Sequence, residues 1–372
     1  MPYSRAHIEE NTILLCVAGS RMYNLHTPSS DWDYRGVMAR PISTYAGWSQ
    51  FEQKNEGWEK EPSIGGVFSQ LGGDTTIYDL RKFLTLLREG RPNQIEYLFA
   101  KDYLHLTEAG KYLISQRDKF LTNQIKFRFI GYAKSQIQRM ETHRKWLLDP
   151  PSKPPEKSEF GVDVMSRDEV NALCELLWVS VKDRLEYLRP VEELATLLSE
   201  KIDYKAIFKN YPLKDELIKP ASIILNTTES AITRLQRSQR YYAELRKWQN
   251  YQHWLKKRNP ERAKLETKVG YDTKHALHCL RLLFQAYFLF RDQFLYVDLT
   301  EVDPYMKEML VGIKQGKVSY EEVKKASDFW FNTLYEEDTS KLPNPISYQE
   351  LETILFETIS KHELQKKGIL SS

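Results

Sequence analysis

A buried strand that ends in a glycine turn and is followed by paired aspartates limits the fold of this chain more than any other feature. Residues 12–18 form a continuous apolar run, and Gly19-Ser20 follows directly, which is typical of a strand that ends in a tight turn. A second strand is predicted over residues 32–38, with Asp31 and Asp33 at its start. Side chains two residues apart share one face of a strand, so these two carboxylates can share a cation.

The first hundred or so residues are predicted to be mixed α/β, and the remainder helical. A third strand is expected at 75–78 after Gly72-Gly73, and Asp79 can cap a helix over 80–88. After about Thr107, apolar residues recur three and four apart, which predicts helices. We therefore expect an α+β protein with an exposed Pro-rich loop at 149–160. The expected later helices cover residues 166–188, 192–201, 221–258, 273–293, 320–336 and 347–362.

Composition excludes several classes of protein. The chain has 372 residues, of which 41% are hydrophobic and 28% charged, with a net charge of +3, so any argument for a polyanionic partner must be local. No run approaches the roughly 18 apolar residues of a membrane span, and acidic Glu9-Glu10 precedes the first apolar run, unlike in a secretion signal. The three cysteines lie far apart in apolar runs, which predicts neither a disulfide framework nor a cysteine metal site. A cytoplasmic protein is expected.

The glycine turn and the aspartates together predict a site for a metal-bound triphosphate. Gly19 lets the backbone approach a ligand, and Ser20 begins a predicted helix whose free N–H groups and positive end favour phosphate oxygens. A third carboxylate is also expected. Asp74, which opens the third strand, is favoured over Asp79, which falls on the other face and suits a helix cap; Glu96 is the more remote alternative.

The order of strand, Gly-Ser turn, Asp-x-Asp strand and acidic strand start resembles the signature of the polymerase-β-type nucleotidyltransferase superfamily. More of the chain resembles a narrower group, the RNA-ligase-associated nucleotidyltransferase family of bacteria and phages. The similar runs are Gly-Ser-x-x-Tyr from Gly19, residues 30–37, residues 78–83, Pro92-Asn93-x-x-Glu96, and the C-terminal segment 270–283. Asn24 departs from the glycine that is frequent in the family, although Asn tolerates the left-handed conformation.

The resemblance implies a polymerase-β-like catalytic core at residues 1–110 and a helical substrate-binding domain at 111–372. It implies two Mg²⁺ ions, or Mn²⁺, held by Asp31, Asp33 and Asp74, with an NTP such as ATP as nucleotide donor. The acceptor implied is an RNA end, in RNA repair or end modification and in functional association with an RNA ligase.

A second group of candidate residues lies in the helical half. Lys274, His278 and Arg281 fall at i, i+4 and i+7 and share one helical face, where they could contact nucleotide phosphates; the alternative is a solvated face with one satisfied histidine. Arg21 and Lys82 are further candidates to balance phosphate charge. His275 and His278 have a metal-ligand spacing, but no third and fourth ligands follow from the sequence, so no zinc site is predicted.

The segment 234–264 is strongly basic. It contains ten Lys and Arg residues against two Glu, a local charge of +8, and it interleaves Tyr and Trp residues that could stack on bases. For the aromatic residues we favour packing inside the protein; for the charge we favour a polyanion. The predicted nucleic-acid contacts are Arg237, Arg240, Lys256, Lys257 and Arg258.

The sequence thus predicts a two-metal nucleotidyltransferase that transfers an NMP to an acceptor hydroxyl. One alternative keeps this chemistry with a protein or small-molecule acceptor, although the basic segment argues against a small molecule. A second is a catalytically silent RNA-binding module, which intact carboxylates beside a phosphate-binding turn disfavour. A third, a helical adaptor, leaves the Gly-Ser and Asp-x-Asp order unexplained.

Overall fold

The computed structural model describes residues 4–28, 30–45, 51–55, 68, 71, 74–187, 211–300 and 302–369. The chain forms two compact units, which are described separately: unit 1 contains residues 1–144 and 265–372, and unit 2 contains residues 145–264. The boundary expected near residue 110 falls inside unit 1, because C-terminal helices return to complete the core of the N-terminal sheet. The predicted Gly72-Gly73 turn and the predicted helix at 192–201 lie outside the described residues.

Unit 1 is built on a five-stranded mixed sheet with the order β3-β4-β2-β1-β5. β2 and β4 run parallel, whereas β1 pairs antiparallel with both β2 and β5, and β3 pairs antiparallel with β4. The α+β fold class is confirmed, and the predicted first strand matches β1. The strand bounds are Thr12–Ala18 (β1), Asp33–Met38 (β2), Gln53–Lys54 (β3), Asp74–Asp79 (β4) and Tyr103–Leu106 (β5).

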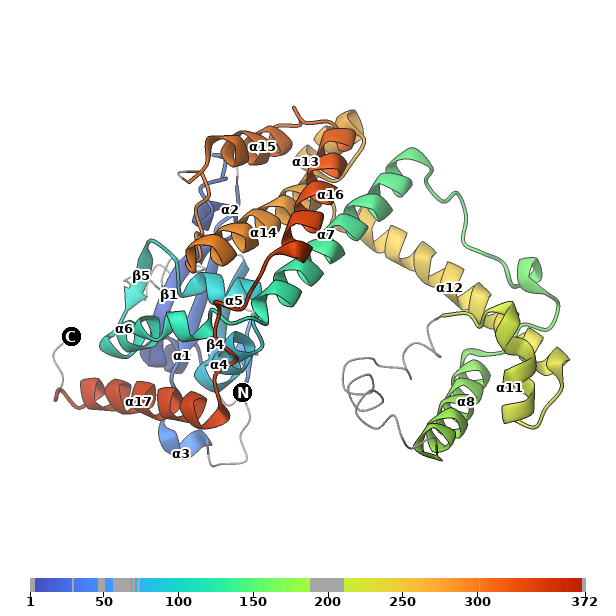
Figure 1. Cartoon of the computed structure of the whole chain (residues 1–372), viewed down its shortest axis with the longest axis horizontal. Coiled ribbons are helices and arrows are strands. Elements are labelled where there is room, and N and C mark those ends of the chain that lie inside the picture. Colours follow the sequence, from blue (N-terminus) through green and yellow to red (C-terminus); the bar gives the residue numbers. More distant parts are fainter. Residues whose placement is uncertain are drawn as a thin grey trace. The chain divides into compact units, whose positions relative to one another are not determined.

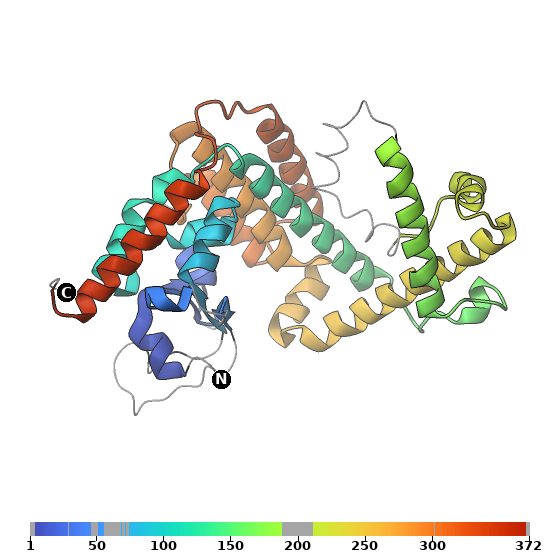
Figure 2. The same ribbon diagram turned by 90° about the horizontal axis from the view of Figure 1, so that it is seen from below.

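Several of the shorter helices of unit 1 bury apolar residues in its core. In α4 (Leu80–Arg88), residues 80, 83, 84 and 87 are buried, the spacing of one helical face. α17 (Tyr348–Lys366), near the C-terminus, lies against α6 (Glu108–Ser115) and α4 (Figures 1 and 2). The C-terminus of the chain therefore helps to close the N-terminal core. The other short helices are α1 (Arg5–Asn11), α2 (Gly19–Met22), α3 (Ile42–Tyr45) and α5 (Pro92–Tyr97).

Longer helices complete unit 1. α14 (Thr273–Asp292) packs against α15 (Pro304–Lys314) and α16 (Tyr320–Glu336). Most of α14 is buried, and its apolar side chains belong to the same core cluster as those of β1 and α4. The helices are thus continuous with the core of the sheet. α7 (Ile125–Leu148) leaves unit 1 near its end, and α13 (Pro260–Val269) brings the chain back.

Unit 2 has a small core of its own. Its helices within the described residues 145–187 and 211–264 include α8 (Arg167–Tyr187), α11 (Ile218–Ile224) and α12 (Glu229–Lys257), and the predicted capping box of Ser166 with Glu169 is present at the start of α8. Residues 149–156 form no regular element, and a 3₁₀ turn follows at Lys157–Phe160, so the Pro-rich loop is confirmed. The single helix expected at 221–258 is wrong: the chain turns at Asn226, with φ 46°, and Thr228 caps α12 anew.

None of the helices that the structure describes is long and apolar enough to cross a bilayer.

Candidate active site

Asp33 lies directly against the backbone of the glycine turn. It is the first residue of β2 and pairs with Ala18, the last residue of β1. Gly19 follows with φ +64°, and a Cβ atom built on it would lie 2.0 Å from Asp33 Oδ2. Both observations demand glycine here, since other L-residues rarely adopt this φ and any Cβ would collide with the carboxylate. Gly19 thus lets the backbone lie close to the Asp33 carboxylate, and its approach to a ligand stays a prediction.

Asp74 lies beside Asp33 across the parallel pair of strands. The register places Asp33 opposite Asp74, at the start of both β2 and β4. Burial raises the pKa of the Asp33 carboxyl, and the charges of Asp74 and Asp31 raise it further, whereas the charges of Arg35 and Lys274 lower it. The three predicted carboxylates therefore share one electrostatic environment, in which their like charges repel.

These residues fit the divalent cations that the resemblance implies. Asp31 and Asp74 are exposed and Asp33 is half-buried, so oxygen ligands face solvent at one end of the sheet. The repulsion that raises the pKa of Asp33 is relieved by a cation placed among the carboxylates. Carboxylate oxygens are also the ligands that Mg²⁺ and Mn²⁺ prefer.

Arg35 is a member of this site that the sequence prediction missed. Its Nη2 atom lies 3.1 Å from Asp74 Oδ2, and Nη1 donates to the backbone oxygen of Asp74 at 2.6 Å. The signal was present in the sequence, because the alternation that puts Asp31 and Asp33 on one strand face also puts Arg35 there. Arg35 holds the start of β4 against β2 and thereby positions Asp74.

The turn after Gly19 is shorter than expected. α2 is a single turn, so its dipole contributes little, although the backbone N–H groups at its start remain available. Ser20 is partly exposed beside Gly19. Asn24 has φ 54°, the left-handed conformation that the sequence analysis required of it, and its side chain donates to Thr300 Oγ1 at 3.0 Å.

Two of the cations expected to balance phosphate charge make contacts within the protein. Arg21 stacks on the ring of Trp32, with its Cζ atom 3.8 Å from the ring centroid, and donates to the backbone oxygen of Ser30. Lys82 lies on α4, beyond the far end of β4 from Asp74, and pairs with Glu52 at 3.1 Å. Both side chains therefore stabilise local structure, and Lys82 is too far along the strand to balance charge at Asp74.

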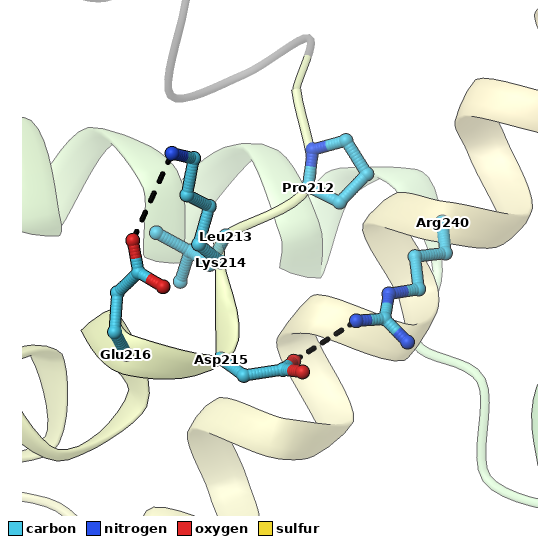
Figure 3. A pocket seen from close by; sticks show the side chains of 6 residues that line it. All are labelled: Pro212, Leu213, Lys214, Asp215, Glu216 and Arg240. Atoms are coloured by element: carbon cyan, nitrogen blue, oxygen red, sulfur yellow. Dashed lines mark hydrogen bonds and ion pairs between the residues drawn. The ribbon is translucent and has the colours of Figure 1, made fainter.

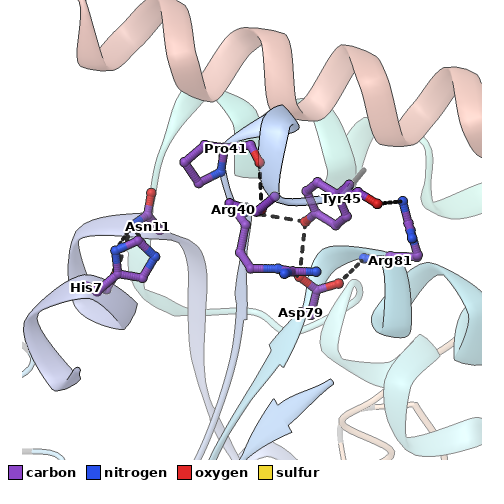
Figure 4. A network of polar contacts seen from close by, with 8 residues as sticks. His7, Asn11, Arg40, Pro41, Tyr45, Asp79 and Arg81 are labelled. Atoms are coloured by element: carbon purple, nitrogen blue, oxygen red, sulfur yellow. Dashed lines mark hydrogen bonds and ion pairs between the residues drawn. The ribbon is translucent and has the colours of Figure 1, made fainter. Parts of the chain in front are cut away.

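Asp79 and Glu96, the alternatives for the third carboxylate, are buried and hydrogen-bonded to other residues of unit 1. Asp79 is buried, caps α4 through the backbone N–H of Arg81, and accepts from Arg40 Nε at 2.6 Å and the Tyr45 hydroxyl at 3.1 Å (Figure 4). The prediction that Asp79 caps this helix is confirmed. Glu96 is fully buried and accepts from the Tyr23 hydroxyl and from Arg281.

The exposure of the helical face shared by Lys274, His278 and Arg281 changes along α14. Lys274, on the first turn of α14, is exposed, makes no ion pair with any described residue, and acts on the pKa of Asp33. Arg281 is 1% exposed, is paired with Glu96, and lies over the ring of Tyr23. Its predicted contact with nucleotide phosphates is wrong, because the guanidinium is buried and paired with Glu96 in the core. Burial, with Arg281 and Lys274 nearby, lowers the pKa of His278 well below its usual value, so His278 brings no positive charge.

The first turn of α14 is held by a polar cluster. Asp272 caps the helix by accepting from the backbone N–H of His275 at 3.0 Å, and its other oxygen lies 2.6 Å from His143 Nδ1 on α7. Burial alone would raise the pKa of Asp272, but hydrogen bonds from His143 and His275 lower that pKa to about 2. The start of the helix, and with it Lys274, is thereby fixed.

The basic segment of unit 2 is partly neutralised by its own unit. Arg237 lies 3.6 Å from Asp163, and Arg240 lies 3.0 Å from Asp215, beside a hollow that is lined by residues 212–216 (Figure 3). Arg258 stacks on Trp254 and donates to the backbone oxygen of Ala263. Lys256 and Lys257 are exposed and make no ion pair with any described residue. Of the five predicted nucleic-acid contacts, these two lysines are thus the ones that no other described residue neutralises.

The aromatic residues of the basic segment pack within unit 2, as expected. Trp146 contacts the rings of Tyr251 and Trp254 at centroid distances of 5.7 and 5.4 Å, and Tyr241 contacts Phe160 at 5.7 Å. Tyr241 and Tyr251 are buried. These rings stabilise the unit.

Comparison with known families agrees with this geometry. Residues 3–150 match the RlaP family, described as the RNA repair pathway DNA polymerase beta family. Comparison with curated proteins and with solved structures gave no match. The matched segment contains the turn, all the predicted carboxylates and Arg35, whereas α14 and α12 lie beyond it. Over residues 3–150, the chain is therefore similar to the RNA repair pathway DNA polymerase beta family.

Proposed function

We propose that this protein is a nucleotidyltransferase that transfers an NMP from an NTP to the hydroxyl of an RNA end and releases pyrophosphate. The observation that carries the proposal is the register of β2 and β4, which places Asp33 opposite Asp74 while Gly19 holds the backbone against Asp33. A polymerase-β-type family match to this segment, with its RNA repair context, supports the same chemistry.

Each group has a role that follows from its position. Asp31, Asp33 and Asp74 would hold two Mg²⁺ ions, which when bound activate the attacking hydroxyl and neutralise the triphosphate. The backbone N–H groups at Gly19 and at the start of α2 would donate to phosphate oxygens at close range. Lys274, which is exposed and acts on Asp33, would stabilise negative charge on the phosphates. Arg35 is a positioning residue, since it holds Asp74 in register.

The RNA acceptor is supported by charge that the fold leaves available. Lys256 and Lys257 at the end of α12 would contact backbone phosphates, with Arg237, Arg240 and Arg258 contributing where their present partners release them. A functional association with an RNA ligase is part of the same proposal, because an end-modifying enzyme prepares the substrate on which a ligase acts.

The test is incubation of the purified chain with each labelled NTP, Mg²⁺ and RNAs that have defined 5′ and 3′ ends. We expect a labelled RNA with one preferred NTP, and no labelled product from Asp33→Asn. Asp118→Asn is the matched control, since Asp118 is an exposed aspartate far along the chain from the carboxylates. Label on a protein instead of RNA would replace the RNA acceptor by a protein hydroxyl. Equal label from the wild type and from Asp33→Asn would refute the carboxylate site.

A further inference from the structure

Two histidines and an aspartate, none of them among the catalytic carboxylates, converge in unit 1. His143 comes from α7, and Asp272 and His275 come from the first turn of α14. One side-chain nitrogen or oxygen of each lies within 4.8 Å of the others. Asp272 Oδ2 is 2.6 Å from His143 Nδ1 and 3.8 Å from His275 Nε2. All three residues are buried or partly buried.

The ring of His275 is already oriented as a metal ligand would be. Its Nδ1 atom lies 2.7 Å from Oε1 of Gln136, a buried amide whose oxygen only accepts hydrogen bonds. Nδ1 therefore carries the proton, which leaves a lone pair on Nε2, the atom 3.8 Å from Asp272 Oδ2. Metal-binding histidines are held in this way, with the second ring nitrogen donating to an oxygen. Asp272 uses Oδ1 for the helix cap, and Oδ2 accepts from His143 Nδ1, so a bound cation would replace the proton between these two atoms.

We propose that His143, Asp272 and His275 bind a divalent cation of the Zn²⁺ class, at a site distinct from the Mg²⁺ carboxylates. Imidazole nitrogen suits Zn²⁺ far better than Mg²⁺. Two nitrogens and one carboxylate oxygen provide three of four tetrahedral ligands, and water completes the set. The sequence argument against zinc considered His275 with His278; the ligand that it lacked is His143, which is distant along the chain.

Nearby charge limits the affinity of this site. Arg139 and Lys274 both act on His275, and only one ligand is an anion, so the binding energy must come mainly from the nitrogen ligands. A bound cation would join α7 to the turn of α14 that carries Lys274, and so would fix that turn more firmly than the hydrogen bonds do alone.

The test is a titration of the chelator-treated full chain with Zn²⁺ against a chromogenic competitor, in excess Mg²⁺. Asp272→Asn retains a good helix cap but loses the anionic ligand, and His143→Gln retains a donor for Asp272 but loses the imidazole. His253→Ala, an exposed histidine on α12, is the matched control. We expect one tightly bound Zn²⁺ per chain in the wild type and in His253→Ala, and at least tenfold weaker binding in the other two variants.

Two results would overturn the site. One is a wild type that binds no Zn²⁺ with a Kd tighter than about 100 µM. The other is unchanged Zn²⁺ binding in Asp272→Asn and His143→Gln, which would place the ion elsewhere. Asp33→Asn separates this proposal from the proposed function, because it should abolish nucleotidyl transfer and leave Zn²⁺ binding as in the wild type.

Discussion

The aspartates at the two ends of strand β4 lie in opposite environments. Asp79 is buried, caps α4 and is paired with Arg40, whereas the side chain of Asp74 is 63% exposed and lies beside Asp33. The same contrast recurs on α14, where Arg281 is paired in the core and Lys274 is exposed. We infer that a charged residue in a functional pattern either stabilises the fold or is available to a ligand. Its burial and its ion-pair partners distinguish the two cases.

Asp79→Ala tests the fold-serving end of β4. Removal of one partner of a buried pair leaves Arg40 uncompensated, and the cap of α4 is lost as well. We expect a loss of about 3–5 kcal/mol in the free energy of unfolding, measured by urea denaturation. A loss below about 1 kcal/mol would show that the Asp79 network contributes only its cap.

Arg281→Ala should lower the free energy of unfolding by a similar amount, about 3–5 kcal/mol, because Glu96 would remain buried without its cation. Chemical denaturation measures the change. Arg281→Ala combined with Glu96→Gln should recover part of the loss. A double variant as unstable as the sum of the two single variants would contradict a direct pairing.

Asp74→Asn tests the ligand-serving end of β4. We expect nucleotidyl transfer to fall more than a hundredfold, since a metal ligand is lost. The free energy of unfolding should change by less than about 0.5 kcal/mol, because the carboxylate is exposed. Transfer rates with RNA and Mg²⁺, beside a melting curve, measure both quantities. Wild-type rates in this variant would exclude Asp74 as the third ligand.

Lys274→Ala should slow transfer by about tenfold, or about 1.4 kcal/mol in activation free energy, while the melting temperature stays near that of the wild type. Lys274→Arg should keep most of the rate, because it preserves the charge. If Lys274→Ala slowed transfer only as much as it lowered the melting temperature, Lys274 would belong with Arg281 as a residue of the fold.

The smallest effect is expected on α12. Substitution of Lys256 and Lys257 by Gln should reduce the salt dependence of RNA binding by about 1.4 in log–log slope, at about 0.7 per phosphate contact on single strands. Substitution of Arg237 and Arg240 by Gln should reduce it less, since these residues are paired with Asp163 and Asp215. Filter binding from low to moderate salt compares the two variants. An equal change would mean that RNA displaces the aspartates freely.

Local patterns predicted most of the fold. The apolar run of β1, the cap at Asp79 and the capping box at Ser166 are properties of neighbouring residues, and each is found where expected. The break before α12 escaped prediction because Asn226 in a left-handed conformation leaves no strong signal in sequence. Strand alternation predicted Asp31 and Asp33 on one face, but β2 begins at Asp33, so Asp31 lies just before the strand. The same alternation could have identified Arg35.

Contacts between distant segments could not be predicted. The burial of Arg281 depends on Glu96, and the cluster at Asp272 depends on His143 from another helix. Helical periodicity places Lys274 and Arg281 on one face but does not say how far along that face the core extends. Likewise, the local charge of α12 did not reveal that Asp163 and Asp215 would neutralise part of it.

The pairing of Glu96 with Arg281 also determines when unit 1 can complete its fold during translation. The two residues are 185 positions apart, and ribosomes add about 5–20 residues per second, so roughly 10–40 s pass between their translation. During that interval the nascent sheet has emerged without the cation that its buried glutamate requires. Unit 1 should therefore become resistant to protease only after α14 has left the ribosome, and chaperones have that interval in which to hold the incomplete sheet.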